Sequence, residues 1–515
     1  MTTHSKTNEN PVPSRQFLGH PKGLYYLFFA EMWERFSFHG MRAMLIIYMT
    51  QELLYNDEKS FGVYAAYGSI LYATPLIGGM LADKIIGYRN AIIIGGILMT
   101  IGHFTMAIET PVFFYSSLAL IIIGNGFFKP NISSMVGTLY TDQDPKRESG
   151  YTIFYLGINV GGALAPLICA WLGYEYGWHY GFGAAGIGMI LGLLSFIMGT
   201  RSNVFKNQGL PPKNASYPPQ KASFVIFIIA LICVPMFAFT IYFYEFEHYL
   251  VWLVTLGVIV ILAFIFRQVS KIEKHRLLVV SYFIVLATVF WAIFEQAGSS
   301  LTLFAARNVN LEFLNASQTN SLNSGFIMLL AIPFSMLWKF LSKHDKNFSS
   351  TIKFGIGLIL LGLGYLLFAY SSTQADSFAR VPMYFLVFGT LIYTIGELFI
   401  SPIGLSKASE LSPARYAAFV MGMWFLSSFY GHFFAGKLAG LTTHDNITTG
   451  TGFIDKILFS ITQLDPGTID ASQFNWIQLY QYVSTFGLFG LFAVSLGVFA
   501  LIIAPFVKRG MHGIL

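Results

Sequence analysis

Glu31-Met-Trp-Glu34-Arg35-Phe-Ser-Phe38-His39-Gly-Met-Arg42 places four charged side chains inside an apolar part of the chain. The stretch Leu24-Tyr-Tyr-Leu-Phe-Phe-Ala precedes it, and Ala43-Met-Leu-Ile-Ile-Tyr-Met follows it. At the centre of a bilayer each charged residue costs roughly 2.5–3.5 kcal/mol, so four unpaired charges would cost about 10 kcal/mol. Positions 31, 34, 35, 38 and 42 share one face of a helix. We therefore expect this face to line a bundle interior or an aqueous cavity; purely structural ion pairs are the alternative interpretation.

The composition indicates a polytopic membrane protein. Of the 515 residues, 55% are hydrophobic and 11% are charged, and the mean hydropathy is +0.60. A soluble protein of this size could not bury so much apolar surface. The formal charge of +6 is expected to lie mainly in cytoplasmic loops, and nucleic acid is excluded as a partner because no basic domain occurs. Cys169 and Cys233 lie in apolar stretches, which favours small buried residues over a disulfide or a metal site.

About fourteen segments reach the roughly 20 residues that a bilayer requires. Their expected ranges are 23–52, 61–83, 90–109, 112–136, 148–175, 180–200, 223–245, 249–268, 277–304, 321–343, 353–373, 380–404, 412–436 and 476–506. Lys and Arg concentrate in alternate loops, which predicts that both termini are cytoplasmic. We predict a cytoplasmic N-terminus (1–20), a six-helix bundle (21–200), a cytoplasmic linker (201–222), an inserted two-helix hairpin (223–270), a second six-helix bundle (271–506) and a cytoplasmic C-terminus (507–515).

Two further polar motifs occur in the first half. Lys129 is followed by a proline, which weakens a helix and frees backbone carbonyls. Largely uncharged residues separate Lys129 from the next loop, so a position in a cavity is favoured over a lysine that extends to the membrane edge. Tyr155 and Asn159 are one helical turn apart and share a face. A hydrogen bond between helices and a contact to a ligand are both open for this pair.

The second half contains isolated acids. Glu295 lies four residues after Trp291, and Glu397 lies four residues before Ser401. An acid inside an apolar helix needs a proton or a cationic partner. Trp424 is interpreted either as a packed aromatic residue or as a pocket wall.

A cavity between the two halves would therefore carry charges of opposite sign on its two walls. The first half contributes Glu31, Glu34, Arg35, His39, Arg42 and Lys129, and the second contributes Glu295 and Glu397. The natural ligand is a zwitterion whose carboxylate lies near the arginines and whose ammonium lies near Glu397. The acids also offer proton sites, which can exchange a proton for a salt bridge as the halves rock. The membrane potential adds about 2.3 kcal/mol per proton per 100 mV.

Six motifs in this chain resemble those of the proton-dependent oligopeptide transporter family. They are Glu31-x-x-Glu34-Arg35-Phe36, Gly124-x-Gly126-x-x-Lys129-Pro-Asn131, Phe154-Tyr155-x-x-Ile158-Asn159, Phe290-Trp-Ala-Ile-Phe-Glu295-Gln, Ser321-Leu-Asn323 and Gly396-Glu397-Leu-x-x-Ser401-Pro. They occur in the family's order and cover most of the length. The resemblance implies an all-α major facilitator fold, in which two six-helix halves enclose a substrate site near the midplane. The inserted helical pair is typical of bacterial members.

The resemblance also implies a role for each residue. The proton-coupling residues would be Glu31, Glu34, Arg35 and Glu295. The outer gate would be a salt bridge between Arg42 and Glu295, and the inner gate a pair of Lys129 and Glu397. The peptide's amino terminus would be held by Asn159, Asn323 and Glu397, and its carboxylate by Arg35, Arg42 and Lys129. Other substrate contacts would come from Phe38, His39, Tyr72, Tyr155, Trp291, Ser401 and Trp424.

Phe38 and His39 depart from the family's pattern, which usually has two tyrosines at these places. The loss of both hydroxyl groups bears directly on peptide affinity and specificity. Our hypothesis is that His39 adds a pH-sensitive contact, and a purely structural polar residue is the alternative.

The sequence thus predicts a symporter that imports di- and tripeptides with protons. It would use the proton gradient and no bound cofactor or metal, and its partners would be short peptides, protons and the lipid bilayer. We expect a monomeric, multi-pass protein of the inner (plasma) membrane. The same fold could instead carry an amino acid, nitrate or a peptide-like metabolite, or the protein could be a non-transporting receptor. An enzyme is not expected, because neither His-Glu-x-x-His nor Gly-x-Ser-x-Gly occurs.

Overall fold

A computed structural model of the chain describes residues 16–141, 143–212, 218–344, 348–443, 452–470 and 472–513. Nearly all of this part is helical. Its extended structure consists of two short pairs, β1 (Gln16–Phe17) with β2 (His20–Pro21) and β3 (Val309–Asn310) with β4 (Val381–Pro382). The predicted termini and the linker at 201–222 fall partly on 1–15, 213–217 and 514–515, which lie outside the described residues.

Six long helices form before the linker in the described ranges 16–141 and 143–212. They are α1 (Lys22–Gln51), α2 (Asp57–Leu81), α3 (Gly87–Met106), α4 (Pro111–Thr138), α5 (Arg147–Tyr176) and α6 (Trp178–Arg201), with the π-helical turn η1 (Ala82–Ile86) between α2 and α3. The inserted hairpin consists of α7 (Pro219–Tyr242), the 3-10 turn η2 (Tyr244–Phe246) and α8 (Glu247–Gln268). Asn56 caps α2 by accepting a hydrogen bond from the Lys59 backbone N–H at 2.9 Å.

The remaining helices follow the hairpin. The long ones are α9 (Lys271–Phe294), α11 (Ser321–Lys343), α12 (Ser350–Tyr370), α13 (Met383–Glu410), α14 (Ala417–Gly440) and α16 (Phe474–Gly510). Shorter elements are η3 (Glu295–Gly298), α10 (Ser300–Asn308), η4 (Gln318–Asn320), η5 (Ser371–Gln374), η6 (Ala414–Tyr416), η7 (Leu441–Thr443), α15 (Phe453–Thr462) and η8 (Pro466–Thr468). Among the described residues, thirteen of the fourteen long helices match the predicted segments to within six residues at each end, and α9 ends ten residues before the predicted end of 277–304.

Length and hydropathy alone identify eleven membrane-spanning candidates among the described residues, one of which, Asp57–Met106, contains both α2 and α3. Helix α1, which carries the charged face, is not among them. The predicted single span at 277–304 is interrupted at η3. The backbone leaves helical geometry at Ser299, with φ −127° and ψ −99°. The preceding Gly298 packs so closely on α2 that a Cβ there would lie 1.8 Å from the Tyr64 hydroxyl, so only glycine fits at 298.

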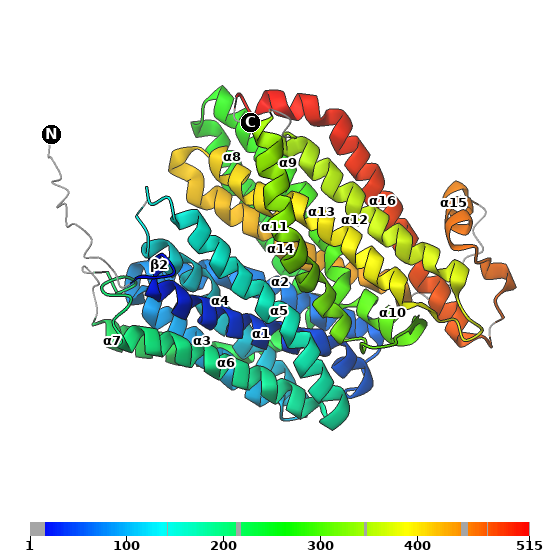
Figure 1. Ribbon diagram of the computed structural model, residues 1–515, viewed down its shortest axis with the longest axis horizontal. Coiled ribbons are helices and arrows are strands. Elements are labelled where there is room, and N and C mark those ends of the chain that lie inside the picture. Colours follow the sequence, from blue (N-terminus) through cyan, green and yellow to red (C-terminus); the bar gives the residue numbers. More distant parts are fainter. Residues whose placement is uncertain are drawn as a thin grey trace.

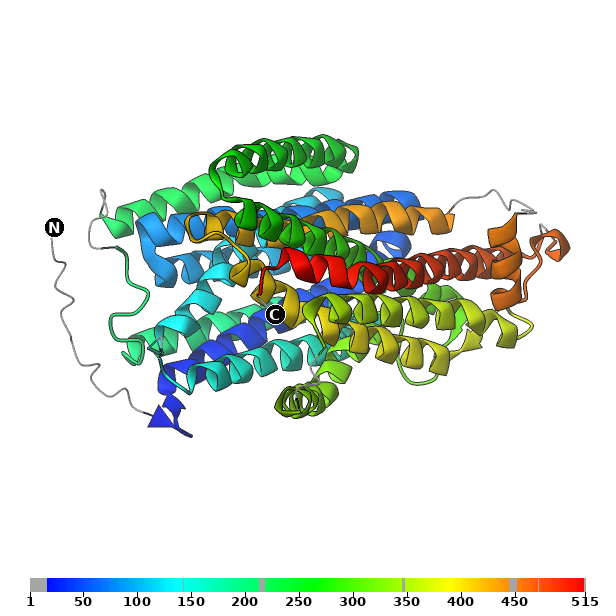
Figure 2. The same cartoon turned by 90° about the horizontal axis from the view of Figure 1, so that it is seen from above.

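The helices form two groups that meet along two seams. Helices α1 to α6 pack on one another, and α12 packs on α13 and α16, with α9 against α14. The groups meet where α2 contacts α14 and where α5 contacts α11. In Figure 1 the blue-to-teal helices of the first group lie below the yellow-to-red helices of the second, and Figure 2 shows most helices running side by side along one direction. The predicted domain boundaries at 21–200 and 271–506 stay a prediction.

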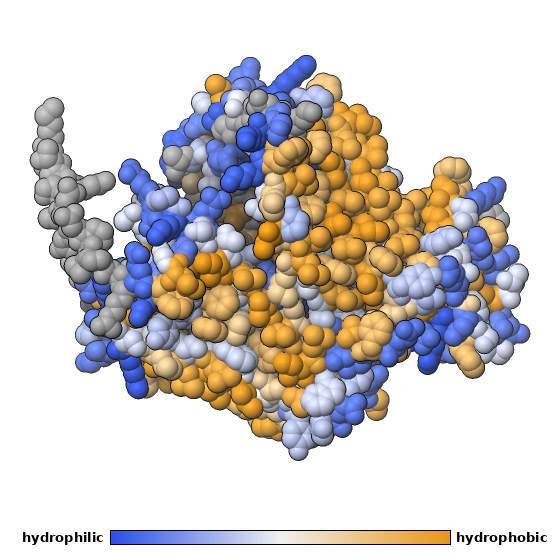
Figure 3. Space-filling model, viewed as in Figure 1, coloured by the Kyte–Doolittle hydropathy of each residue, from blue (hydrophilic) through white to orange (hydrophobic). Residues whose placement is uncertain are grey.

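The surface agrees with a position in a bilayer. Figure 3 shows apolar residues covering the flanks of the molecule, with hydrophilic residues gathered at its two ends. Large apolar side chains such as Trp252, Ile332 and Ile502 are mostly exposed. Soluble monomers rarely expose contiguous apolar patches larger than a few hundred Å², so these flanks are suited to contact with lipid.

Candidate functional site

The charged face of α1 is buried and largely paired within itself. The Arg35 guanidinium donates to both Glu34 carboxylate oxygens, at 2.5 and 2.6 Å. Its Nε also lies 3.5 Å from Glu31 Oε1. In the described part of the chain, Glu31 Oε2 has no hydrogen-bond partner. One arginine therefore serves two acids, and Glu31 is the more loosely held of the two.

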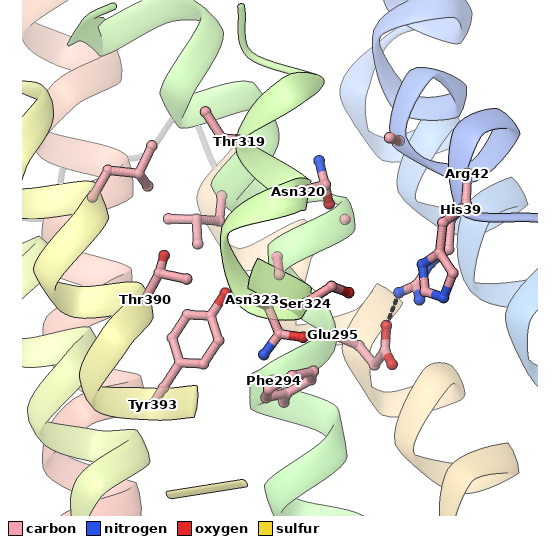
Figure 4. A pocket seen from close by; sticks show the side chains of 15 residues that line it. His39, Arg42, Phe294, Glu295, Thr319, Asn320, Asn323, Ser324, Thr390 and Tyr393 are labelled. Carbon is pink, nitrogen blue, oxygen red and sulfur yellow. Dashed lines mark hydrogen bonds and ion pairs between the residues drawn. The ribbon is translucent and has the colours of Figure 1, made fainter. Parts of the chain in front are cut away.

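Arg42 joins the two halves at one end of the site. Arg42 lies about two helical turns after Arg35 on the same face of α1. It forms a hydrogen-bonded salt bridge with Glu295 of η3, drawn as a dashed line in Figure 4. Its Nε also donates to the Tyr64 hydroxyl at 2.7 Å. His432 of α14 brings its Nε2 to 3.8 Å from the same Glu295 carboxylate. The structure thus brings together the predicted outer pair, with Tyr64 and His432 around it.

A second ion pair also crosses between the halves. Arg307 at the end of α10 donates to both Asp57 oxygens at the start of α2, at 2.5 and 2.7 Å. Its Nη1 also donates to the Tyr482 hydroxyl at 2.9 Å. This bidentate geometry is the strong form of an arginine–carboxylate pair.

The opposite wall is formed by α11 and α13. The Asn323 amide donates to Glu397 at 2.9 Å and to the Thr394 hydroxyl at 3.0 Å. Asn323 therefore fixes the position of Glu397, and it leaves acceptor capacity on the carboxylate for a cation.

Lys129 and Glu397, the predicted inner pair, are not joined by a salt bridge among the described residues. The Lys129 ammonium instead lies 5.1 Å from the centre of the Tyr72 ring, a cation–π contact. The Tyr72 ring in turn packs on His432, with ring centres 4.9 Å apart. The structure therefore shows the outer pair made and the inner pair open.

A cavity lies between the walls and takes residues from both halves. In Figure 4, His39 and Arg42 face it from α1, and Glu295, Asn323 and Tyr393 face it from the second half. Its other lining residues are Ala43, Phe294, Ala297, Gly298, Leu301, Thr319, Asn320, Ser324, Leu386 and Thr390. His39, which the sequence analysis assigned to the substrate site, lines this cavity.

Phe38 lies elsewhere. Its ring is buried and packs 5.0 Å from the Arg35 guanidinium carbon, and it is not among the residues that line the described cavity. Phe38 therefore contacts the Arg35 guanidinium through the face of its ring. The direct substrate contact that the resemblance implied for Phe38 stays a prediction.

The remaining predicted substrate residues differ in what they contact. Asn159 donates to the backbone carbonyl of Tyr155 in its own helix at 3.0 Å, and the Tyr155 side chain is exposed. The Ser401 hydroxyl is buried and lacks a hydrogen-bond partner within the described ranges. Trp291 packs edge-on against Phe290 and Phe294. Trp424 is buried, and its ring fills the space beside Gly404, so the packed interpretation of Trp424 agrees with this structure.

A family model described as the POT family matches residues 89–454 of this sequence. The chain belongs to the POT family. It is 36% identical to the uncharacterized transporter YclF of Bacillus subtilis (strain 168), over 98% of both chains. It is 35% identical to the peptide transporter YePEPT of Yersinia enterocolitica, over 86% of this chain and 92% of that one. A crystal structure of peptide transporter POT in complex with sulfate has a TM-score of 0.79 at 32% identity and 98% coverage of both chains.

Membership of the POT family confirms the resemblance drawn from the six motifs and the major facilitator type of architecture. The POT-family chain is a multi-pass membrane transporter, as the apolar segments predicted. Its named relatives include peptide transporters.

Three contacts of this POT-family site were missed by reasoning from sequence. They are the Asp57–Arg307 bridge, the approach of His432 to Glu295, and the hydrogen bond from Arg42 to Tyr64. Each joins residues that are far apart in the chain, so no local spacing could reveal the pairing. The nearest available signal was the isolated position of His432 in an apolar helix, which on its own does not identify a partner.

Proposed function

We propose that this protein is a symporter that imports di- and tripeptides together with protons by alternating access. The proton gradient drives it, without a bound cofactor. The observation that carries the proposal is the separation of charge across the site. Arg35 and Lys129 belong to the first half, and Glu397 belongs to the second, where it accepts a hydrogen bond from Asn323 of the cavity wall. A short peptide carries an ammonium and a carboxylate several ångströms apart and can satisfy both walls.

The arginine-rich wall supports carboxylate binding. Arg35, Arg42 and Lys129 are each assigned to the peptide carboxylate, and Glu397 with Asn159 and Asn323 to its amino terminus. A guanidinium recognises a carboxylate through paired hydrogen bonds. Because Arg35 and Arg42 already hold acids in the described conformation, a peptide carboxylate would compete with those acids, and this competition supports a link between substrate and gate.

The shared arginine supports proton coupling through Glu31 and Glu34. Arg35 is bidentate to Glu34 and more distant from Glu31. A proton on Glu31 would remove one negative charge from a buried cluster and leave the Arg35–Glu34 pair intact. Glu31 is therefore the member of the motif that we assign to proton uptake, with Glu295 as the second acid whose release from Arg42 opens the outer side.

The test is uptake of labelled dialanine into liposomes under an imposed proton gradient, acidic outside. We expect accumulation that a protonophore abolishes, with competition from unlabelled di- and tripeptides and none from tetra-alanine, alanine or nitrate. Competition by alanine or nitrate without uptake of peptide would favour the same fold with a different cargo. Binding of dialanine without any flux would favour a receptor. The mass of the purified protein in detergent, against 57.5 kDa for one chain, tests the expected monomer.

A further inference from the structure

The inserted hairpin of α7, η2 and α8 contacts both halves of the transporter. On one side, α7 packs against the first half through an apolar cluster. Ala82 and Ile86 of η1, Ile94 of α3 and Phe127 of α4 are buried there, together with Ala230 of α7. Further apolar residues of α7 that pack on this cluster are Ile226, Phe227, Leu231, Val234 and Phe237. Helix α7 is thus attached to the first half by burial of apolar side chains.

Helix α8 is attached to the second half by hydrogen bonds. The Thr255 and Tyr430 hydroxyls lie 2.8 Å apart, in the middle of α8 and α14. At the end of α8, the Tyr416 hydroxyl donates to Gln268 Oε1 at 2.5 Å, and the Arg415 guanidinium donates to the Gln268 backbone carbonyl. These contacts hold α8 along α14 over half of its length. In Figure 2, α8, in green, lies at the edge of the molecule.

The turn between the two helices lies over the seam where α2 meets α14. The Tyr244 ring occupies the space beside Gly62 of α2, where a Cβ would come within 2.2 Å of it. Glu247, at the start of α8, is buried and lies near the Ser69 hydroxyl of α2 and the Lys437 ammonium of α14. The turn therefore contacts α2 of the first half, and the start of α8 beside it lies near Lys437 of the second half.

We propose that the hairpin is a strap across the α2–α14 seam, in which α7 moves with the first half, α8 moves with the second, and η2 is the hinge. This inference rests on the alternating access of the proposed function. Away from η2, the two helices make few contacts with each other in the described residues. When the ends of the halves opposite to η2 separate, the angle between α7 and α8 must open with them. The strap therefore limits how far that side opens.

The test uses pairs of spin labels on exposed residues in liposomes. Labels at Phe224 of α7 and Phe264 of α8 report the angle of the hairpin. Labels at Met198 of α6 and Phe425 of α14 report the separation of the halves. The Met198–Phe224 and Phe264–Phe425 pairs are the matched controls within each half. Each pair is measured at pH 5 and pH 7.5, with and without dialanine, after Cys169 and Cys233 have been replaced by alanine.

We expect the Phe224–Phe264 and Met198–Phe425 distances to change together, while both control distances stay constant. The strap is overturned by a constant Phe224–Phe264 distance while the halves move, or by a Phe264–Phe425 distance that changes. A Met198–Phe425 distance that stays constant under every condition would instead overturn the alternating access on which the inference rests.

A second variant tests the attachment of α8 directly. Tyr416→Phe with Tyr430→Phe removes two hydroxyls that bond to α8 and keeps the aromatic rings. We expect the Phe264–Phe425 distance distribution to broaden at least twofold, while the Met198–Phe224 distribution keeps its width. An unchanged Phe264–Phe425 width would show that these hydrogen bonds do not fasten α8, which would overturn the strap.

Discussion

Replacing Glu295 with glutamine should move the protein away from the conformation in which the outer side is closed. The Arg42 and Glu295 side chains are 18% and 6% exposed, so the bridge is largely removed from solvent. Loss of one partner of a buried ion pair costs about 3–5 kcal/mol, because the other charge stays buried without its counter-charge. Tyr64 still accepts a hydrogen bond from Arg42 at 2.7 Å, and Arg42 keeps some exposure. We therefore take the lower limit, about 3 kcal/mol.

This cost destabilises only the conformation in which the outer side is closed, because the Arg42–Glu295 bridge joins the two halves in that conformation. A difference of about 3 kcal/mol changes a conformational equilibrium roughly 150-fold. A protein that is almost entirely closed on this side would then populate the open conformation to a readily measured extent. The assay is the distance between spin labels at Leu54 and Phe313, two exposed residues in the first and second halves that lie near the Asp57–Arg307 bridge.

We expect the Leu54–Phe313 distance in Glu295→Gln to shift towards longer values. The matched control is the double variant Arg42→Met with Glu295→Gln, which removes both charges at similar side-chain volume. Because no unpaired charge is then buried, most of the shift should be reversed. An unchanged distance in the single variant, or an equal shift in the double variant, would refute the assignment of this bridge to closure of the outer side.

Three further predictions concern the opposite wall, the first helix and a helix crossing. Glu397→Gln should reduce proton-driven dialanine uptake at least tenfold, because the ammonium loses its charged partner; full active uptake would contradict the assignment. His39→Tyr, which restores the family's usual residue in the cavity, should change both the apparent affinity for dialanine and the pH profile of its uptake, and the hypothesis fails if neither changes. Gly78→Ala should destabilise the protein by about 1–3 kcal/mol in thermal unfolding, since its Cβ would lie 2.0 Å from the Gly126 carbonyl oxygen; an unaltered melting temperature would show that α2 and α4 can separate at no cost.

The long helices could be predicted because their signal is local. An apolar run of bilayer length, with Lys and Arg at alternate ends, needs no knowledge of tertiary contacts. The interruption at η3 could not be predicted in this way. The chain leaves helical geometry at Ser299, next to the place where Gly298 packs on the Tyr64 hydroxyl of α2, and this packing joins segments that are distant in the sequence.

The site could be predicted in its residue types and less well in its pairings. Glu31, Glu34 and Arg35 share a face by spacing alone, and the structure shows them in contact. The choice among partners from the other half is decided by tertiary packing. Tertiary packing also places the Phe38 ring against the Arg35 guanidinium, a contact that the resemblance did not indicate.

In the described conformation only one of the two predicted gating pairs is made, which leaves the charges of the other pair available for other partners. In the described conformation Arg42 holds Glu295, whereas Lys129 contacts the Tyr72 ring and Glu397 holds Asn323. A cation–π contact stabilises a lysine by about 0.5–2 kcal/mol. This is only part of the stabilisation that an ionic partner would give in an apolar setting. A peptide whose carboxylate binds Lys129 and whose ammonium binds Glu397 would give both side chains an ionic partner while the two halves stay apart. After the peptide leaves, the same two residues can pair with each other. Substrate release and inner closure would then use the same two charges in turn.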